Sequence, residues 1–232
     1  MPRAAASAAC DFAVSTGPVW PLGFLPHTKK LFILCSDDSS VHEWNLAEGR
    51  ETRSWRTLQH KNADAGLAAT TDEQGLLIYH GSWGLLRNAA NGGERIITHD
   101  LQGATLSPDG KHYANVSKAG FAKLWEAETL REVHTFGRFL LGAHTVTFSP
   151  DGKRLAAGSG GHEAIRLWDV ESKQELLTLA GQGLVFMKSA FSADGNVLGA
   201  MNDQGVLHLW RAPSWEEIEA EEANEKAESK QP

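Results

Sequence analysis

Residues 149–169 read SPDGKRLAAGSGGHEAIRLWD, and this stretch contains the pattern that decides the fold. Its first four residues predict a tight turn, because proline presets φ at the first corner and glycine supplies the positive φ that ends the turn. Residues 155–158 and 165–168 read as two short strands that the Gly-rich residues 159–161 connect. The stretch therefore predicts a hairpin within a meander of antiparallel strands.

The same pattern recurs at intervals of 42 or 43 residues. Related turns stand at residues 107–110 and 192–195. Each turn ends in a glycine, and a tryptophan follows after 15 or 16 residues: Gly110 and Trp125, Gly152 and Trp168, Gly195 and Trp210. A turn and an aromatic residue that share one period indicate tandem copies of one structural unit.

Two further copies precede these three. Trp44 closes residues 41–45 two periods before Trp125, and residues 85–88 fill the slot between them with Arg87 where tryptophan is expected. We therefore predict a disordered N-terminus at 1–10, a repeat domain at 11–212 and an acidic helical tail at 213–232. The predicted repeats are 11–49, 50–92, 93–131, 132–174 and 175–212.

Over residues 11–212 these motifs resemble those of the WD-repeat β-propellers. The resemblance implies an all-β fold of about five four-stranded blades around a channel, each repeat supplying the outer strand of one blade and three inner strands of the next. In that family a third-strand tryptophan, a turn aspartate and a histidine before the first strand belong to a buried network. The resemblance assigns structural roles of this WD type to Asp38, Trp44, His60, Trp125, Trp168, Asp169, Asp203 and Trp210.

The number of repeats leaves the closure of the ring open. Residues 11–14 stand where an outer strand belongs and could complete the last blade of a closed five-bladed ring. The alternative is an incomplete form of a larger propeller, whose open blade edges would favour self-association.

The C-terminal residues carry a second resemblance and a helix signal. Residues 209–219 resemble the ends of bacterial proteins in which WD repeats follow a Ser/Thr kinase domain, which implies a regulatory fragment of a larger signalling protein as one possibility. Residues 214–217 form a capping box that predicts a short helix. Trp215 and Ile218 would share one face of it and dock on the last blade, whereas the alternative is an acidic tail that binds a partner.

Composition excludes several classes of protein. The net charge is −7, and residues 216–230 hold seven Glu and two Lys, so the rest of the chain is close to neutral and lacks the basic surface that nucleic acid binding requires. No apolar run is long enough to span a membrane. Cys10 and Cys35 are too few for a disulfide framework, and we expect a reducing, cytoplasmic location.

The sequence shows no catalytic, cofactor-binding or metal-binding motif. The Gly-rich residues 158–161 lack the Lys-Ser/Thr pair of a phosphate loop and are expected to form a turn. His42 and His208 each stand two residues before a tryptophan, a slot that we expect to be solvated. The expected innermost strands contain no carboxylate, and we expect their single histidine, His144, to be structural.

We therefore predict a non-enzymatic interaction or scaffold module that binds a protein or peptide through its propeller loops. Trp83 and His162 are the candidate partner-binding residues, although Trp83 between two turn glycines also fits a role in the core. The alternative class is a propeller hydrolase or lyase with a site in its channel.

Overall fold

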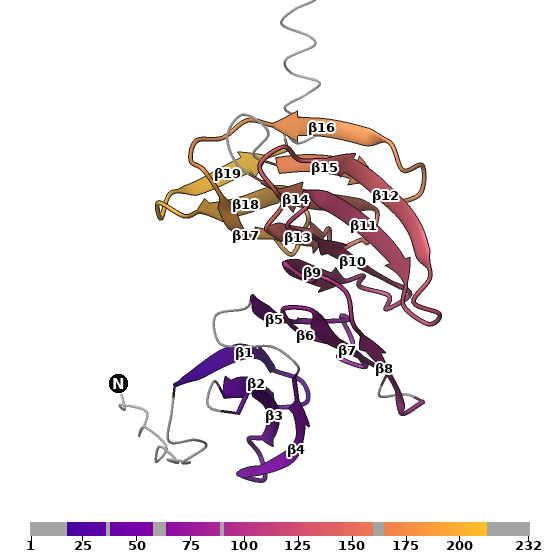
Figure 1. The fold of residues 1–232 in the computed structure, drawn as a ribbon, viewed down its shortest axis with the longest axis vertical. Coiled ribbons are helices and arrows are strands. Elements are labelled where there is room, and N and C mark those ends of the chain that lie inside the picture. Colours follow the sequence, from indigo (N-terminus) through magenta and orange to yellow (C-terminus); the bar gives the residue numbers. More distant parts are fainter. Residues whose placement is uncertain (1–17, 36–37, 58–63, 89–90, 160–164, 213–232) are drawn as a thin grey trace, which may run out of the picture. The chain divides into compact units, whose positions relative to one another are not determined.

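The computed structural model describes residues 18–35, 38–57, 64–88, 91–159 and 165–212 (Figure 1). The residues within these ranges form nineteen β-strands in five sheets and contain no helix. The predicted strand at 11–14, the predicted helix in 213–232, His60 and His162 all lie outside the described residues.

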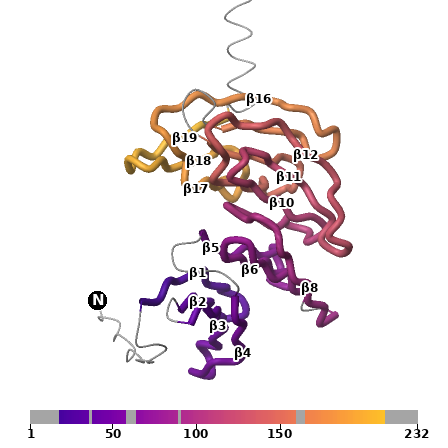
Figure 2. Tube along the Cα trace, viewed as in Figure 1, coloured from indigo at the N-terminus to yellow at the C-terminus, as the bar shows by residue number. Residues whose placement is uncertain are grey.

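Each sheet is a meander, because its strands pair in the order in which they occur along the chain (Figures 1 and 2). The first sheet holds β1 (Val19–Leu25), β2 (Lys30–Cys35), β3 (Ser40–Asn45) and β4 (Arg50–Arg56). The second holds β5 (Ala65–Ala69), β6 (Gly75–His80), β7 (Trp83–Asn88) and β8 (Gly93–Ile97). The third holds β9 (Gly103–Leu106), β10 (His112–Val116), β11 (Phe121–Glu126) and β12 (Glu132–Arg138). The fourth holds β13 (Thr145–Phe148), β14 (Arg154–Gly158), β15 (Ile165–Asp169) and β16 (Glu175–Leu179), and the last holds β17 (Phe186–Phe191), β18 (Val197–Asn202) and β19 (Leu207–Arg211).

The all-β architecture of antiparallel sheets is the one that the sequence predicts. The third strand of every sheet carries the residue that the repeat singles out, namely Trp44, Arg87, Trp125, Trp168 or Trp210. This architecture is consistent with a β-propeller.

One turn geometry recurs between the first two strands of the second, third, fourth and fifth sheets. In the copy at 149–152 the Ser149 hydroxyl donates to Asp151, whose carboxylate also accepts from the backbone N–H of Lys153 at 3.1 Å. Gly152 ends the turn with φ of 73°. Glu73, Gly110, Gly152 and Gly195 take the same left-handed position in these four copies, whereas in the first sheet the left-handed residue is Lys29, one position later and next to β2. Glu73 holds this conformation without being glycine, so the turn persists where its glycine has been lost.

Glu73 also ties the turns of the first two sheets together. Its carboxylate accepts hydrogen bonds from the backbone N–H groups of His27 at 3.1 Å and Thr28 at 2.8 Å, and from the Thr28 hydroxyl at 2.8 Å. Burial alone would raise the pKa of Glu73, but these hydrogen bonds outweigh it and the pKa is lowered. The carboxylate therefore remains ionised at neutral pH.

The chain divides into two compact units, residues 1–113 with 126–131 and residues 114–125 with 132–232. In the first unit, facing sides of the first two sheets form one apolar cluster that includes Phe32, Val41, Ile78 and Leu85. The second unit contains two apolar clusters, which lie on opposite faces of β14. Leu155 and Ala157 point into one cluster and Ala156 into the other, as the two-residue period of a strand requires.

Candidate functional site

Arg87 on β7 stands where the other repeats carry tryptophan, and it faces a buried carboxylate. Glu43 on β3 is 1% exposed, and its carboxylate lies 2.5 Å from Arg87 Nη1 and 2.7 Å from Lys30 Nζ. The Thr52 hydroxyl donates to the same carboxylate at 3.0 Å. Burial would raise the pKa of Glu43, but the Lys30 hydrogen bond and the two positive charges together lower it. Glu43 is thus a buried anion with matched partners.

This network continues along the same edge of the first unit. Arg53 on β4 pairs with Glu94 on β8, and Arg87 Nε lies 3.9 Å from the Glu94 carboxylate. The charges of the network are paired with one another. We therefore assign Arg87 to the packing of the first two sheets and not to ligand binding.

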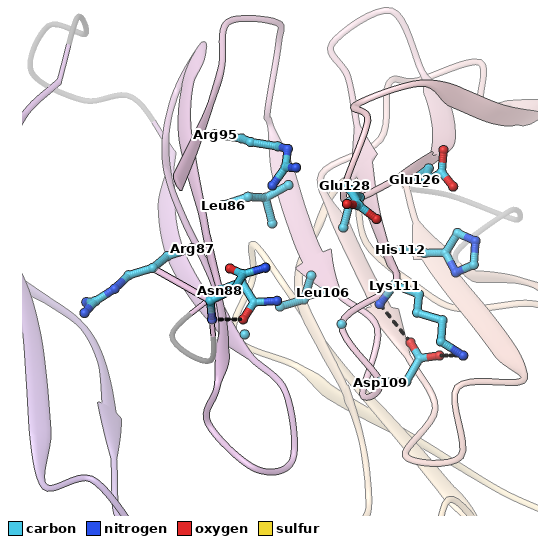
Figure 3. A pocket seen from close by; sticks show the side chains of 14 residues that line it. Leu86, Arg87, Asn88, Arg95, Leu106, Asp109, Lys111, His112, Glu126 and Glu128 are labelled. Carbon is cyan, nitrogen blue, oxygen red and sulfur yellow. Dashed lines mark hydrogen bonds and ion pairs between the residues drawn. The ribbon is translucent and has the colours of Figure 1, made fainter. Parts of the chain in front are cut away.

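A pocket of about 470 Å³ lies in the first unit, beside this network (Figure 3). One wall comes from the second sheet, with Leu86 and Asn88 on β7 and Arg95 on β8. The opposite wall comes from the turn at 109–111, from the start of β10 and from residues 126–128. A volume of this size falls within the range of ordinary ligand sites.

Hydrogen bonds fix the wall formed by the two turns. Asp109 accepts from the Ser107 hydroxyl at 2.7 Å and from the Lys111 backbone N–H at 3.1 Å, and its other oxygen lies 3.6 Å from Lys111 Nζ. The backbone N–H of Ala127 donates to the Lys111 carbonyl at 2.8 Å, which joins residues 126–128 to the turn. Burial would raise the pKa of Asp109, but these hydrogen bonds and the Lys111 charge outweigh it, and the pKa is lowered. Asp109 is therefore a structural anion of the wall.

The walls also carry one cationic and one anionic side chain, Arg95 and Glu128. No described residue forms an ion pair or a hydrogen bond with the side chain of Arg95 or of Glu128. Both residues line the pocket, and Figure 3 shows them on its two sides. Leu86, Asn88 and Leu106 also line the pocket. The pocket thus offers a cation, an anion and an apolar surface.

The first strands of the sheets, β1, β5, β9, β13 and β17, contain no Asp, Glu or His. Over the described ranges, no three His, Cys, Asp or Glu side chains gather closely enough to hold a metal ion. His144 precedes β13, and its backbone N–H donates to the Gly158 carbonyl at 2.9 Å.

Of the two candidate partner-binding residues, Trp83 is described, and it lies in the core. It is 4% exposed and belongs to the apolar cluster of the first two sheets. The two-residue turn after His80, with Gly81 at φ of 60°, places Trp83 opposite His80 at the start of β7 and directs it inward. The interpretation of Trp83 as an exposed interface anchor is therefore corrected.

The described residues with expected WD-type structural roles differ in burial and in the contacts that they make. Trp168 is 2% exposed, with its ring 5.0 Å from that of Phe136, and the Trp125 Nε1–H donates to Asn115 at 2.7 Å. Trp44 is half-buried opposite Leu31. The remaining side chains make local contacts: Asp38 with Ser40, Asp169 with Ser172, Asp203 with the backbone N–H of Val185, and Trp210 with the ring of His208.

The two histidines expected in a solvated slot are held by protein groups instead. His42 Nε2 lies 2.6 Å from the Ser40 hydroxyl, and its Nδ1 lies 3.0 Å from Glu51. His208 Nε2 accepts from the Gln182 backbone N–H at 3.1 Å, and its ring stacks on Trp210. A backbone N–H and an aromatic ring thus fix His208, which the comparison among repeats alone did not reveal.

Sequence reasoning missed Arg95 and Glu128 as site residues. Arg95 lies on β8 outside any motif, and Glu128 lies in the turn after β11, so only the folded chain brings both residues to one pocket. Trp20 was also missed as a surface aromatic, because it stands in an apolar strand, yet it is 62% exposed. Its signal was weak, since apolar strands of this kind are normally buried.

Comparisons with known proteins agree with the geometry of the sheets. No family model matches the chain. Telomerase protein component 1 of Rattus norvegicus is 28% identical over 161 residues, which are 67% of this chain and 6% of that protein. Small ribosomal subunit protein RACK1y of Oryza sativa subsp. japonica is 29% identical over 120 residues, 48% of this chain and 34% of that protein. Both are WD-repeat proteins, so the chain is similar to a part of each of two eukaryotic WD-repeat proteins.

Within the described ranges, no helix combines the length and the hydropathy that crossing a bilayer requires.

Proposed function

We propose that this chain is a WD-repeat propeller module that binds an extended peptide segment of a protein partner, without catalysing a reaction. The similarity to WD-repeat proteins supports the class of protein. The pocket beside the second sheet supports the mode of binding. The observation that carries the proposal is the pair of opposite charges on the two sides of that pocket, Arg95 and Glu128, with which no described residue forms an ion pair or a hydrogen bond.

The chemistry of the pocket selects the class of ligand. A peptide that carries an acidic side chain meets the Arg95 guanidinium, which binds carboxylates in a bidentate manner. A basic side chain on the same peptide meets Glu128. Leu86 and Leu106, which also line the pocket, accept an apolar side chain. The expected ligand is therefore a short segment with an acidic, an apolar and a basic side chain.

The structure also argues against a nucleic acid or a simple anion as the occupant. The lining residues Arg87, Arg95 and Lys111 are balanced by Asp109, Glu126 and Glu128. A phosphate backbone would meet as many negative as positive charges, and phosphate binding depends on an excess of positive charge. A ligand with both charges avoids this repulsion.

The test is a selection from a library of randomised 12-residue peptides with the purified full chain, repeated with Arg95→Glu. We expect wild-type protein to enrich peptides with one acidic and one basic residue flanking an apolar residue. Arg95→Glu should select against the acidic residue, because the charge on that wall is reversed. Arg50→Glu is the matched control, since Arg50 is an exposed cation of the same unit and does not line the pocket.

Arg50→Glu should select the same peptides as the wild type. Circular dichroism of the three proteins confirms that each is folded. The proposal fails if the wild type enriches no charged motif, or if Arg95→Glu and Arg50→Glu change the selected peptides equally.

A further inference from the structure

The last sheet has one face that is apolar and exposed. Strand register places three rows of side chains on it: Lys188, Met201 and Leu207; Ala190, Gly199 and Leu209; Val197 and Arg211. We call these eight residues the outer face. Residues at the alternate positions, including Leu198, Ala200 and Trp210, point into or against the apolar cluster shared with the fourth sheet.

The outer face has the apolar composition of a surface that is normally buried, although its side chains are exposed. Met201 is 44% exposed, Leu207 is 60% exposed and Leu209 is 65% exposed. A strand with one face in water normally alternates apolar and polar residues, whereas β19 has leucines on one face and His208 with Trp210 on the other. Contiguous exposed apolar residues of this kind indicate a surface that binds another group.

Charge and space at the outer face define what fits on it. Lys188 and Arg211 stand at opposite corners of the three rows, and the face contains no Asp or Glu. The middle row has little side-chain bulk at Ala190 and Gly199, where an added Cβ would lie 3.2 Å from Leu209 Cδ2. The surface therefore suits large apolar side chains that are flanked by acidic residues.

The chain contains such a segment directly after β19. Residues 213–232 include Trp215 and Ile218, three positions apart, and residues 216–230 hold seven Glu against two Lys. Trp215 follows Arg211 by four residues, which an extended chain spans with up to about 14 Å. The three strands are only about 10 Å across, and a helix is about 10 Å in diameter. The segment can therefore reach the outer face and cover it.

We propose that residues 213–232 fold back onto the outer face, with Trp215 and Ile218 over the middle row and the glutamates near Lys188 and Arg211. A second copy of the chain fits less well. A symmetric pair would bring the same surface to both sides, so it would add cations to cations. Attachment to β19 also holds the segment at an effective concentration in the millimolar range. This proposal concerns the second unit and is independent of the peptide pocket in the first.

Cysteine cross-linking in the full chain tests this contact. Met201→Cys is combined with Ile218→Cys in a Cys10→Ser background, where Cys35 is buried. The control pair joins Ile218→Cys to Glu171→Cys, in a turn of the fourth sheet in the same unit. We expect the first pair to form an intramolecular disulfide in glutathione buffer at least tenfold more readily than the control. Adding Lys188→Glu and Arg211→Glu should lower its yield several-fold.

Hydrogen exchange of the full chain gives a second readout that needs no new cysteine. Trp215→Ser with Ile218→Ser should raise exchange of β19 amides several-fold and leave β15 unchanged. The proposal is overturned if both cysteine pairs form disulfides equally, if the disulfide joins two chains instead of one, or if the double serine variant exchanges like the wild type.

Discussion

The second and fourth sheets place different chemistry at the same position of the repeat. In the fourth sheet Trp168 packs on Phe136 and Phe139, at ring distances of 5.0 and 6.0 Å. In the second sheet the same position holds Arg87, which reaches the buried Glu43 of the first sheet. In each case the side chain meets a partner on the sheet that precedes its own. This position therefore requires a side chain that packs on or pairs with a residue of the preceding sheet, and it does not require an aromatic ring.

Substitutions in the Trp168 contact and in the Arg87–Glu43 pair should destabilise the protein for different reasons. An apolar contact loses energy in proportion to the atoms that are removed, whereas a buried ion pair leaves an uncompensated charge when one partner is lost. Mutations at the two positions therefore test apolar packing in one case and a buried ion pair in the other, within the same repeat.

The largest effect is expected at the aromatic position. Trp168→Ala should lower the free energy of unfolding by about 4 kcal/mol, because a fully buried aromatic side chain is removed from a packed cluster. Urea denaturation followed by far-UV circular dichroism measures this loss. Trp168→Phe keeps a ring against Phe136 and should cost less than half as much. Equal losses in both variants would contradict the role of ring packing.

Removal of the buried carboxylate should have the next largest effect. Glu43→Ala should cost about 3 kcal/mol, because Lys30 and Arg87 lose the anion that compensates their charges. The same denaturation experiment applies. Glu48→Ala removes an exposed carboxylate that pairs with Arg50 and should change stability by less than about 0.5 kcal/mol. A small loss in Glu43→Ala would show that the network contributes little.

The charged network around Glu43 should also make the free energy of unfolding depend on pH. The pKa of Glu43 is lowered from its ordinary value of 4.5, so its stabilising effect is complete above that pH and is lost as the pH falls through the folded-state pKa. The unfolding free energy of the wild type should fall more steeply below pH 4.5 than that of Glu43→Gln. Parallel pH profiles of the two proteins would refute this linkage.

The smallest effect is expected at the turns. Lys29→Gly should stabilise the chain by about 0.5 kcal/mol, because glycine adopts the left-handed conformation without the steric cost that lysine bears at φ of 53°. Gly152→Ala should destabilise by about 1 kcal/mol for the same reason. Thermal unfolding of both variants measures the difference, and shifts of the same sign would contradict a left-handed conformation at both positions.

Sequence periodicity predicts the all-β sheets because turn and tryptophan report on local backbone geometry. Ser149 to Gly152 is such a signal, and the strands on both sides of that turn form as expected. At Glu73 the glycine of this turn is absent, and hydrogen bonds from the backbone of His27 and Thr28 to its carboxylate accompany a left-handed conformation that glutamate does not favour by itself. The turn of the second sheet could therefore not be predicted from residue type.

The candidate site was less predictable than the fold. Arg95 on β8 and Glu128 in the turn after β11 are 33 residues apart in the sequence, and only the folded chain brings them to one pocket. Trp83 failed as a site residue for the opposite reason, because its flanking glycines suggest a loop rim while a two-residue turn places the ring in the core. Convergence of side chains depends on tertiary structure, which a repeat pattern does not specify in detail.

The most direct test of the proposed function is a charge exchange between protein and peptide. The affinity of a selected peptide is measured by isothermal titration calorimetry with wild-type protein and with Arg95→Glu, and again after the acidic residue of the peptide is replaced by arginine. Binding in the pocket predicts that each single change weakens affinity at least tenfold and that the two changes together restore it to within about threefold. If the exchanged pair binds no better than either single change, the acidic residue does not contact Arg95 and the proposed binding mode is wrong.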